Sequence, residues 1–168
     1  MLLLKTERLY LRQYGQEDIY SLHSIFSDPE TMKYYPAPFS EEQTKNWIIK
    51  NQKRYIEDGF GLWAVCLKET NELIGDCGLV TQNVDGQFEV EIGYHINKKY
   101  WSKGYASEAA EGCKEYGFYQ LGFTKLISII DPRNLPSIRV AEKIGFTKEK
   151  ESFLFDKNHY VYSGNKEP

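Results

Sequence analysis

The chain has 168 residues, of which 41% are hydrophobic and 27% are charged, with a formal net charge of −3. Length and composition fit one globular domain over 1–168, and the slight acidity argues against a nucleic-acid partner, whose protein surface would be basic. No apolar run approaches the roughly 20 residues that cross a bilayer, so no membrane partner is expected.

Two further features bear on the compartment. The opening run Met1 to Arg8 has too short an apolar stretch for the core of a signal peptide. The three cysteines, Cys66, Cys77 and Cys113, lie far apart and lack the spacing of metal ligands. We therefore expect small core cysteines in a reduced, cytoplasmic compartment, and no bound metal.

The N-terminal part of the chain predicts a short strand and two helices. Residues 9–12 alternate like a half-buried strand, and apolar residues at helical spacing predict a helix over 16–27. Ser40 and Gln43 form a capping-box pattern, which predicts a second helix that starts there and ends near Gly59.

Three strands are expected next, over 62–68, 73–84 and 88–96. The segments between them are short and rich in turn residues, so the three strands should form an antiparallel meander. The middle strand is expected to kink at Gly75 and Gly78, because glycine inside a strand often marks a bulge or a close approach of two backbones.

The second half has a different pattern. Small residues form a stripe on one helix over 106–117, 125–130 reads as a buried strand, and 136–144 as a short helix with proline in its first turn. A strand from Phe146 and a last strand from Tyr160 complete the chain. The order β-α-α-β-β-β-α-β-α-β-β predicts an α+β domain with a mixed, largely antiparallel sheet.

A short basic loop before the 106–117 helix is suited to binding phosphate. Gly104 and Ala106 leave backbone N–H groups uncovered where the first turn of a helix has four unpaired donors. Those donors and the positive end of the helix dipole attract anions, and Lys98, Lys99 and Lys103 add charge. A solvated basic loop before an ordinary helix is the alternative interpretation.

The run Trp-Ser-Lys-Gly-Tyr-Ala-Ser-Glu-Ala over 101–109 resembles the coenzyme A pyrophosphate loop of the GNAT superfamily of N-acetyltransferases. The form is that of the RimJ/RimL-like ribosomal-protein N-terminal acetyltransferase branch, with Trp101 where the general pattern has Arg or Gln. The segments 6–12, 74–75 and 134–146 are also similar to family motifs. The resemblance implies the GNAT fold, acetyl-CoA as co-substrate, and direct transfer of acetyl to a primary amine.

Alternation along 88–96 predicts a strand with two different faces. The core face would hold Phe88, Val90, Ile92, Tyr94 and Ile96, and the polar face Glu89, Glu91, Gly93 and His95. In the resembling family this strand diverges from its neighbour and pairs with the pantetheine arm of the coenzyme. The resemblance thus implies these donor-binding residues: Tyr94, His95, Ile96, Trp101, Ser102, Lys103, Gly104, Tyr105, Ala106, Ser107 and Asn134.

Acetyl transfer to an amine also needs a base. A lysine-like amine has a pKa of about 10.4 and is mostly protonated at neutral pH, so a group must take its proton before nitrogen attacks. Because relatives use a glutamate at the matching place, Glu91 is the first candidate, followed by Glu89 and His95. All three could instead be ordinary polar residues of the strand.

The departing thiolate needs a proton or hydrogen-bond donor. Ser137, in the first turn of the 136–144 helix, would place a hydroxyl and a positive dipole beside the sulfur. Ala141 occupies the position where many members of the superfamily carry an acid tyrosine, so the resemblance leaves Ser137, another tyrosine or water for this role. Arg139 on the same helix is a candidate for contact with the coenzyme phosphates, and Asn134 and Ser137 could also be turn and cap residues.

The acceptor is left open between a protein N-terminal α-amine and a small molecule such as a polyamine, aminoglycoside or amino acid. A non-catalytic acyl-CoA-binding module is the alternative from another class. A groove for a cationic acceptor could use Glu89, Glu91 and Asp156. Its aromatic lining could come from Tyr34, Tyr35, Phe39, Trp47, Phe155 and Tyr160. Either a monomer or a homodimer is compatible with the sequence.

Overall fold

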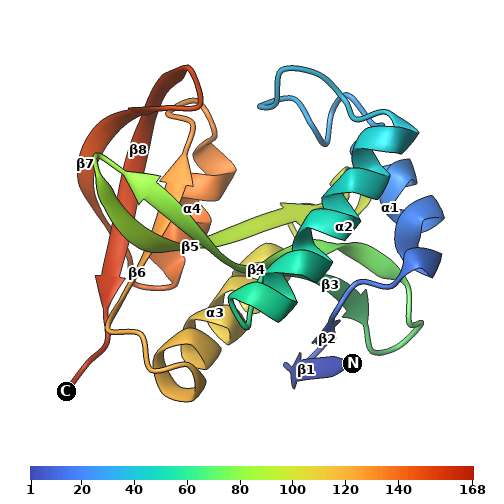
Figure 1. Ribbon diagram of the computed structural model, residues 1–168, viewed down its shortest axis with the longest axis horizontal. Helices are drawn as coiled ribbons and strands as arrows, with labels where there is room; N and C mark the ends of the chain where they lie inside the picture. Colours follow the sequence, from blue (N-terminus) through green and yellow to red (C-terminus); the bar gives the residue numbers. More distant parts are fainter.

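The computed structural model describes residues 1–168 and contains one eight-stranded sheet with the order β1-β2-β3-β4-β5-β6-β8-β7 (Figure 1). Its strands are β1 (Leu2–Lys5), β2 (Leu9–Arg12), β3 (Leu62–Leu67), β4 (Leu73–Val84), β5 (Gln87–Ile96), β6 (Lys125–Ile130), β7 (Thr147–Leu154) and β8 (Lys157–Asn165). Every neighbouring pair is antiparallel except β5 and β6, which are parallel. The expected α+β class and mixed, largely antiparallel sheet are confirmed.

Four helices flank this sheet. They are α1 (Ile19–Phe26), α2 (Glu41–Glu57), α3 (Tyr105–Glu115) and α4 (Leu135–Lys143), with short helical turns at η1 (Gln16–Asp18) and η2 (Lys98–Tyr100) and a π-helical extension of α3 at η3 (Tyr116–Gln120). The capping box that starts α2 is present in full, with both the Ser40 and Gln43 side chains bonded to backbone N–H groups. None of the helices is long and apolar enough to cross a membrane.

Most bounds shift by one or two residues from the expectation, and three elements differ by more. Strand β1 was not predicted, because its apolar residues do not alternate, and it pairs with β2. The helix expected over 16–27 begins as the turn η1, where the Asp18 carboxylate accepts hydrogen bonds from the Gly15 N–H and the Arg12 guanidinium. Strand β8 starts three residues before Tyr160, because Phe155 and Asp156 both adopt positive φ and complete the turn earlier.

Strand β3 explains how the core is divided. Trp63 and Val65 point into the main core, which β4, β5, α3 and α4 share, whereas Ala64 and Cys66 point into a second core under α1 and α2. The strand is therefore apolar throughout, as expected for a strand covered on both faces. The small stripe on α3 is buried against this main core and lets the helix lie close to the sheet.

The sheet opens between β5 and β6. These two strands align at a single residue pair, Glu91 with Ile127, whereas β5 stays paired with β4 as far as Ile96. From Ile92 onward, the edge of β5 that faces β6 has no strand partner. On the other side, β4 approaches β3 closely at Gly78, where a Cβ atom would lie 2.0 Å from the Gly61 carbonyl oxygen. The sequence predicted a kink at Gly78, and the structure shows a close approach of two backbones there instead.

Candidate active site

Two cavities meet where β5 diverges from β6. The first, of about 460 Å³, lies at the start of α3 and along α4, and we call it the α3 cavity. The second, of about 670 Å³, lies between α2, β5 and the β7–β8 turn, and we call it the α2 cavity. Their walls share Lys33, Tyr34, Tyr35, Tyr94, His95, Asn134 and Ser137. A molecule in one cavity would therefore reach a molecule in the other.

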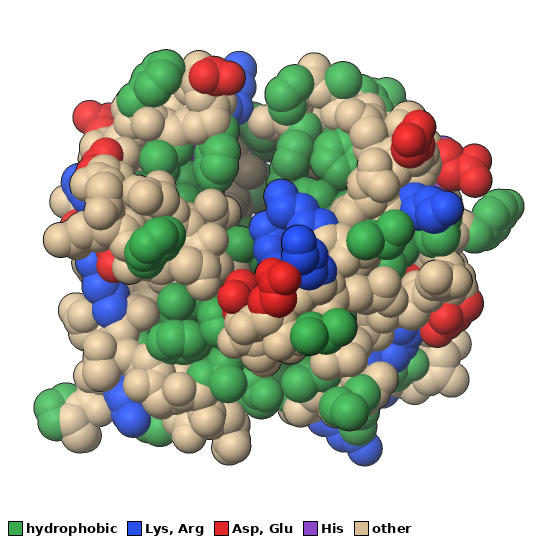
Figure 2. Space-filling model, viewed as in Figure 1, with side chains coloured by type: hydrophobic (Ala, Val, Ile, Leu, Met, Phe, Trp, Pro, Cys, Tyr) green, Lys and Arg blue, Asp and Glu red, His purple; other side chains and the backbone are tan.

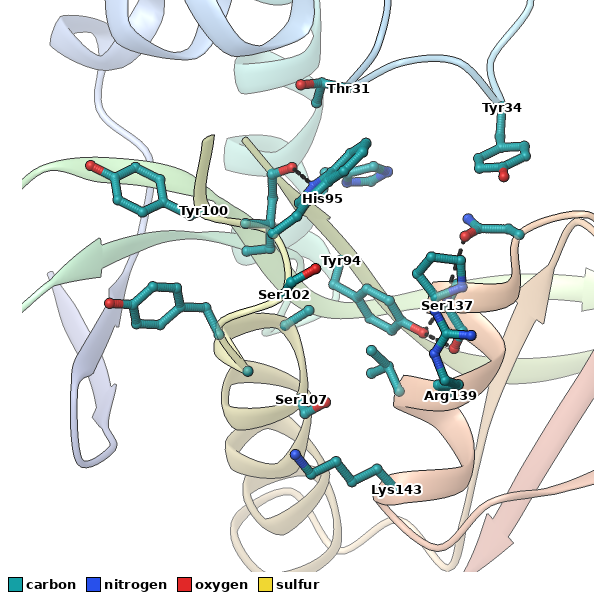
Figure 3. Close-up of a pocket in the computed structure, with 18 of the residues that line it drawn as sticks. Thr31, Tyr34, Tyr94, His95, Tyr100, Ser102, Ser107, Ser137, Arg139 and Lys143 are labelled. Carbon is teal, nitrogen blue, oxygen red and sulfur yellow. Dashed lines mark hydrogen bonds between the residues drawn. The ribbon is translucent and has the colours of Figure 1, made fainter. Parts of the chain in front are cut away.

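The start of α3 forms one wall of the α3 cavity. Ser102 and Gly104 have φ values of 64° and 83°, so the loop turns sharply and Gly104 becomes the N-cap of the helix. Five of the predicted donor-binding residues, Ser102, Gly104, Tyr105, Ala106 and Ser107, line the cavity here (Figure 3). Backbone N–H groups at such a helix start suit a phosphate or pyrophosphate.

The positive charge at this cavity comes from elsewhere than the basic loop. Lys33, Arg139 and Lys143 line it, and Figure 3 shows the last two projecting from α4. The side chains of Lys98, Lys99 and Lys103 do not line it. Lys98 pairs with Asp28 at 3.4 Å, and Lys99 lies over the Tyr100 ring. The cations that line this cavity therefore come from α4 and the 28–40 loop rather than from the basic loop.

The loop before α3 is held in place by the N-terminal segment. The Arg8 guanidinium donates to the Lys103 carbonyl oxygen at 2.9 Å and pairs with the Glu108 carboxylate at 2.7 Å. The Thr6 hydroxyl donates to the same carboxylate. Lys103, a predicted donor-binding residue, therefore contributes its backbone to the anchoring of the loop. These contacts give a structural reason for the opening motif.

The free edge of β5 faces both cavities. Tyr94, His95 and Ile96 line the α3 cavity as predicted. The Trp101 indole N–H donates to the Ile96 carbonyl oxygen at 2.7 Å, which ties the loop to the strand. Each predicted donor-binding residue except Lys103 lines the α3 cavity, including Asn134, whose side chain caps α4 by accepting from the Ser137 N–H.

Ser137 and Tyr94 meet where the cavities join. The Tyr94 hydroxyl lies 2.8 Å from the Ser137 Oγ and donates to the Ser137 carbonyl oxygen at 2.9 Å (Figure 3). Burial raises the pKa of Tyr94 above its ordinary value, so the phenol keeps its proton. A tyrosine hydroxyl thus reaches α4 from β5, while Ala141 on the helix is buried. The sequence left another tyrosine open for this role but did not identify Tyr94, because alternation placed it on the core face.

The two glutamates of β5 have different environments. Glu91 lines the α2 cavity and accepts hydrogen bonds from the Gln82 amide at 3.0 Å and the Ile129 N–H at 3.4 Å. Burial raises the pKa of its carboxyl above the ordinary value. Glu89 lies outside both cavities and pairs with Lys125 at 2.8 Å. The expectation that Glu89 shares a groove with Glu91 is therefore wrong.

A buried hydrogen-bond network stands behind His95. The Asp76 carboxylate is fully buried and accepts from the Tyr14 hydroxyl at 2.7 Å and the Trp47 indole at 2.9 Å, and it lies 2.7 Å from the His95 Nδ1. The His95 Nε2 bonds the Tyr35 hydroxyl at the junction of the cavities. Asp76 was missed, although an aspartate inside an apolar strand was a signal. No three His, Cys, Asp or Glu side chains gather into a metal site.

The aromatic residues considered for the acceptor groove fall into two groups, those that line the α2 cavity and those that pack against the core. Tyr34, Tyr35, Trp47 and Phe155 line the α2 cavity. Phe39 and Tyr160 instead pack against the two core clusters. The 28–40 loop is tethered to the wall of the α2 cavity, because the Tyr34 hydroxyl donates to the Arg133 carbonyl oxygen at 3.2 Å and the Lys157 ammonium donates to the Tyr34 carbonyl oxygen at 3.2 Å.

Comparison with known proteins agrees with this geometry. The acetyltransferase (GNAT) domain model matches residues 8–147. The uncharacterized protein YkkB of Bacillus subtilis is 40% identical over 160 residues, covering 95% of this chain and 93% of that protein. An uncharacterized N-acetyltransferase, p20 of Bacillus licheniformis, is 36% identical over 149 residues, covering 87% and 83%. The crystal structure of a GNAT-family acetyltransferase from Bacillus anthracis superposes with a TM-score of 0.82 at 34% identity, covering 98% of each chain. The chain belongs to the GNAT family of acetyl-CoA-dependent N-acetyltransferases.

Proposed function

We propose that the chain transfers acetyl from acetyl-CoA, bound in the α3 cavity, directly to a primary amine bound in the α2 cavity. The main support is the junction of the two cavities at Tyr94 and Ser137, beside the unpaired edge of β5. The α3 cavity fits the donor because it combines a helix N-terminus, cationic side chains and a free strand edge. Acetyl-CoA supplies the activated acetyl thioester.

The two cavities have different roles in the proposed reaction. Glu91 accepts the proton of the acceptor ammonium, directly or through water, and its raised pKa brings it nearer to neutrality than an exposed carboxyl. Ser137 and Tyr94 present hydroxyl groups at the start of α4, where the helix dipole favours a negative sulfur. The nitrogen therefore loses its proton on the α2 side, and the thiolate is stabilised on the α3 side.

The test is Glu91→Gln, assayed by coenzyme A release with the best amine from a mixed panel. We expect kcat/KM to fall by about 10²-fold or more near neutral pH, the usual contribution of a general base. The deficit should shrink at high pH, where solvent deprotonates the amine, and the KM for acetyl-CoA should stay the same. Glu89→Gln is the matched control, since Glu89 lies on the same strand outside both cavities. Wild-type pH dependence in Glu91→Gln would remove Glu91 as the base.

The acceptor is either a small amine or a protein N-terminal α-amine, and the structure favours the small amine. The α2 cavity has a volume of about 670 Å³, which is typical of sites for small molecules, and Tyr34 is held at its wall by two hydrogen bonds. The RimJ/RimL-like branch supports the peptide alternative only through the loop motif. The solved RimL structure with coenzyme A has a TM-score of 0.79 at 15% identity, which is a likeness of fold. Turnover of N-terminal peptides but of no small amine in the panel would reverse this preference.

We further propose that the 168 residues act as a single catalytic domain in the cytoplasm. Its support is the state of the cysteines: Cys66, Cys77 and Cys113 are buried and unbridged. Buried free thiols of this kind are usual in a reducing compartment.

A further inference from the structure

The α2 cavity carries more positive than negative side chains. Its cations are Lys33, Lys50, Arg54, Arg133 and Lys157, and its carboxylates are Glu91, Asp131 and Asp156. Figure 2 shows lysine and arginine side chains gathered near the centre of this face, below the hollow, with acidic side chains directly beneath them. The acidic groove considered for a cationic acceptor is therefore absent, and the charge balance has the opposite sign.

Several of these cations already have a carboxylate partner. Asp131 pairs with Lys157 at 2.6 Å and with Arg133 at 2.8 Å. Lys33 lies 3.6 Å from Glu30. Lys50 and Arg54 make no ion pair, and Arg54 donates one side-chain hydrogen bond, to the Asn51 amide oxygen at 3.0 Å. These two side chains are the cations of the cavity that a bound anion could neutralise.

Their positions make them a pair. Lys50 and Arg54 stand one helical turn apart on α2 and both line the α2 cavity. Burial lowers the pKa of Arg54 below its ordinary value, although Asp58 and Glu91 oppose this shift. Lys50 lies at the exposed rim of the cavity, where partial desolvation and then charge repulsion from Arg54 lower its pKa. A carboxylate or phosphate bound between the two groups would offset the cost of desolvating them and the repulsion between them. An arginine guanidinium can bind either anion with two parallel hydrogen bonds.

Resting on the proposed function, we infer that the acceptor is a small amine that also carries a carboxylate or phosphate group, which Lys50 and Arg54 bind. Glu91 lines the same cavity, so the amine of such an acceptor would face Glu91 while its anionic group contacts α2. A polyamine would bring further positive charge beside two unpaired cations, which is unfavourable. The site thus selects amines of mixed charge over amines with cationic charge alone.

Matched pairs of acceptors provide the test. Each pair keeps the amine and changes the second group: an amino acid against its carboxamide, an aminoalkyl phosphate against the corresponding amino alcohol, with a diamine of similar length as a third arm. Coenzyme A release gives turnover, and calorimetric titration into the coenzyme A-saturated protein gives binding. We expect an anionic member to exceed its neutral partner in kcat/KM by at least about 10-fold, as for a charge-assisted hydrogen bond. The pair of acceptors with the larger ratio of kcat/KM, anionic over neutral, shows whether the site prefers a carboxylate or a phosphate.

Variants on α2 assign the effect to the pair. Arg54→Gln should raise the KM for the anionic acceptor by about 10-fold or more and leave the KM for acetyl-CoA and for neutral amines unchanged. Lys50→Gln, at an exposed position, should act in the same direction, and Arg54→Lys should restore part of the preference. Lys53→Gln is the control, because Lys53 lies on the same helix, pairs with Glu57 and lines neither cavity.

The inference is overturned if neutral amines or diamines are preferred, if Arg54→Gln and Lys50→Gln leave the ratios unchanged, or if no anionic amine binds or reacts. These outcomes differ from failure of the proposed chemistry. Equal turnover of anionic and neutral amines would refute the anion site at Lys50 and Arg54 but not acetyl transfer. An unaltered pH profile in Glu91→Gln would refute Glu91 as the general base but not the preference for anionic acceptors.

Discussion

Replacing Asp76 by asparagine should reverse the hydrogen bonds around His95. One oxygen of the buried carboxylate accepts from both Tyr14 and Trp47, and the other faces the His95 Nδ1. An indole N–H can only donate, so the asparagine must keep its oxygen toward Trp47 and turn its amide nitrogen toward His95. His95 must then accept at Nδ1 and carry its proton on Nε2, facing the Tyr35 hydroxyl.

The expected cost follows from the number of bonds. Hydrogen bonds to a charged group contribute about 1.5–3 kcal/mol, and those between neutral groups contribute about 1 kcal/mol. Three bonds around a fully buried carboxylate change from the first kind to the second. We therefore expect Asp76→Asn to lower the free energy of unfolding by about 3 kcal/mol.

Urea unfolding followed by circular dichroism measures this loss. Asp58→Asn is the matched control, since Asp58 lies exposed at the C-terminal end of α2 and its replacement should change the free energy of unfolding by less than about 0.5 kcal/mol. Combining Asp76→Asn with Tyr14→Phe should give a coupling energy of about 1 kcal/mol, because both changes affect one hydrogen bond. Nitrogen chemical shifts of His95 report its tautomer. A loss below about 0.5 kcal/mol with an unchanged tautomer would refute the reasoning.

Two further predictions concern the junction and the ion pairs near β6. Tyr94→Phe removes a hydroxyl beside Ser137 and should lower kcat about 10-fold with an unchanged KM for acetyl-CoA in steady-state assays; an unaltered kcat would exclude Tyr94 as a hydrogen-bond donor in the reaction. The ion pairs of Asp131 with Arg133 and Lys157 hold the pKa of its carboxyl below the ordinary 3.8. Their contribution to stability is therefore fully present well above pH 3.8. It is lost as pH falls below 3.8 toward the pKa that this carboxyl has in the folded protein. The difference in unfolding free energy between wild type and Asp131→Asn should therefore narrow between about pH 5 and pH 3, and a constant difference would contradict this assignment.

Features with local causes could be predicted from the sequence. The capping box at Ser40 and Gln43 involves groups three residues apart, and both of its hydrogen bonds form. The bounds of β4 and β6 agree with the expected 73–84 and 125–130. The phosphate loop also depends on neighbouring residues, since Gly104 supplies the left-handed conformation that starts α3. Each of these signals lies within one element.

Features that depend on distant partners could not be predicted. Glu89 and Glu91 look alike in the sequence, and only the position of β6 decides that Glu89 meets Lys125 while Glu91 faces a cavity. The role of Tyr94 depends on α4, more than 40 positions later, which brings Ser137 to its hydroxyl group. Alternation correctly identifies the faces of a strand but does not say what a neighbouring element places against each face.

The single aligned pair between β5 and β6 means that side chains, rather than a backbone ladder, hold the two parts of the sheet together near the active site. Ser128 donates to the Ile92 carbonyl oxygen, Ile129 donates to Glu91, and Tyr94 joins Ser137. The groups that connect β5 to β6 and α4 beside this opening include Glu91, Tyr94 and Ser137, to which the proposed chemistry is assigned. The same side chains therefore connect the structural elements and carry the proposed chemistry. A ligand that pairs with the free edge of β5 would add contacts across this opening, so this region should be more rigid with the ligand bound than without it.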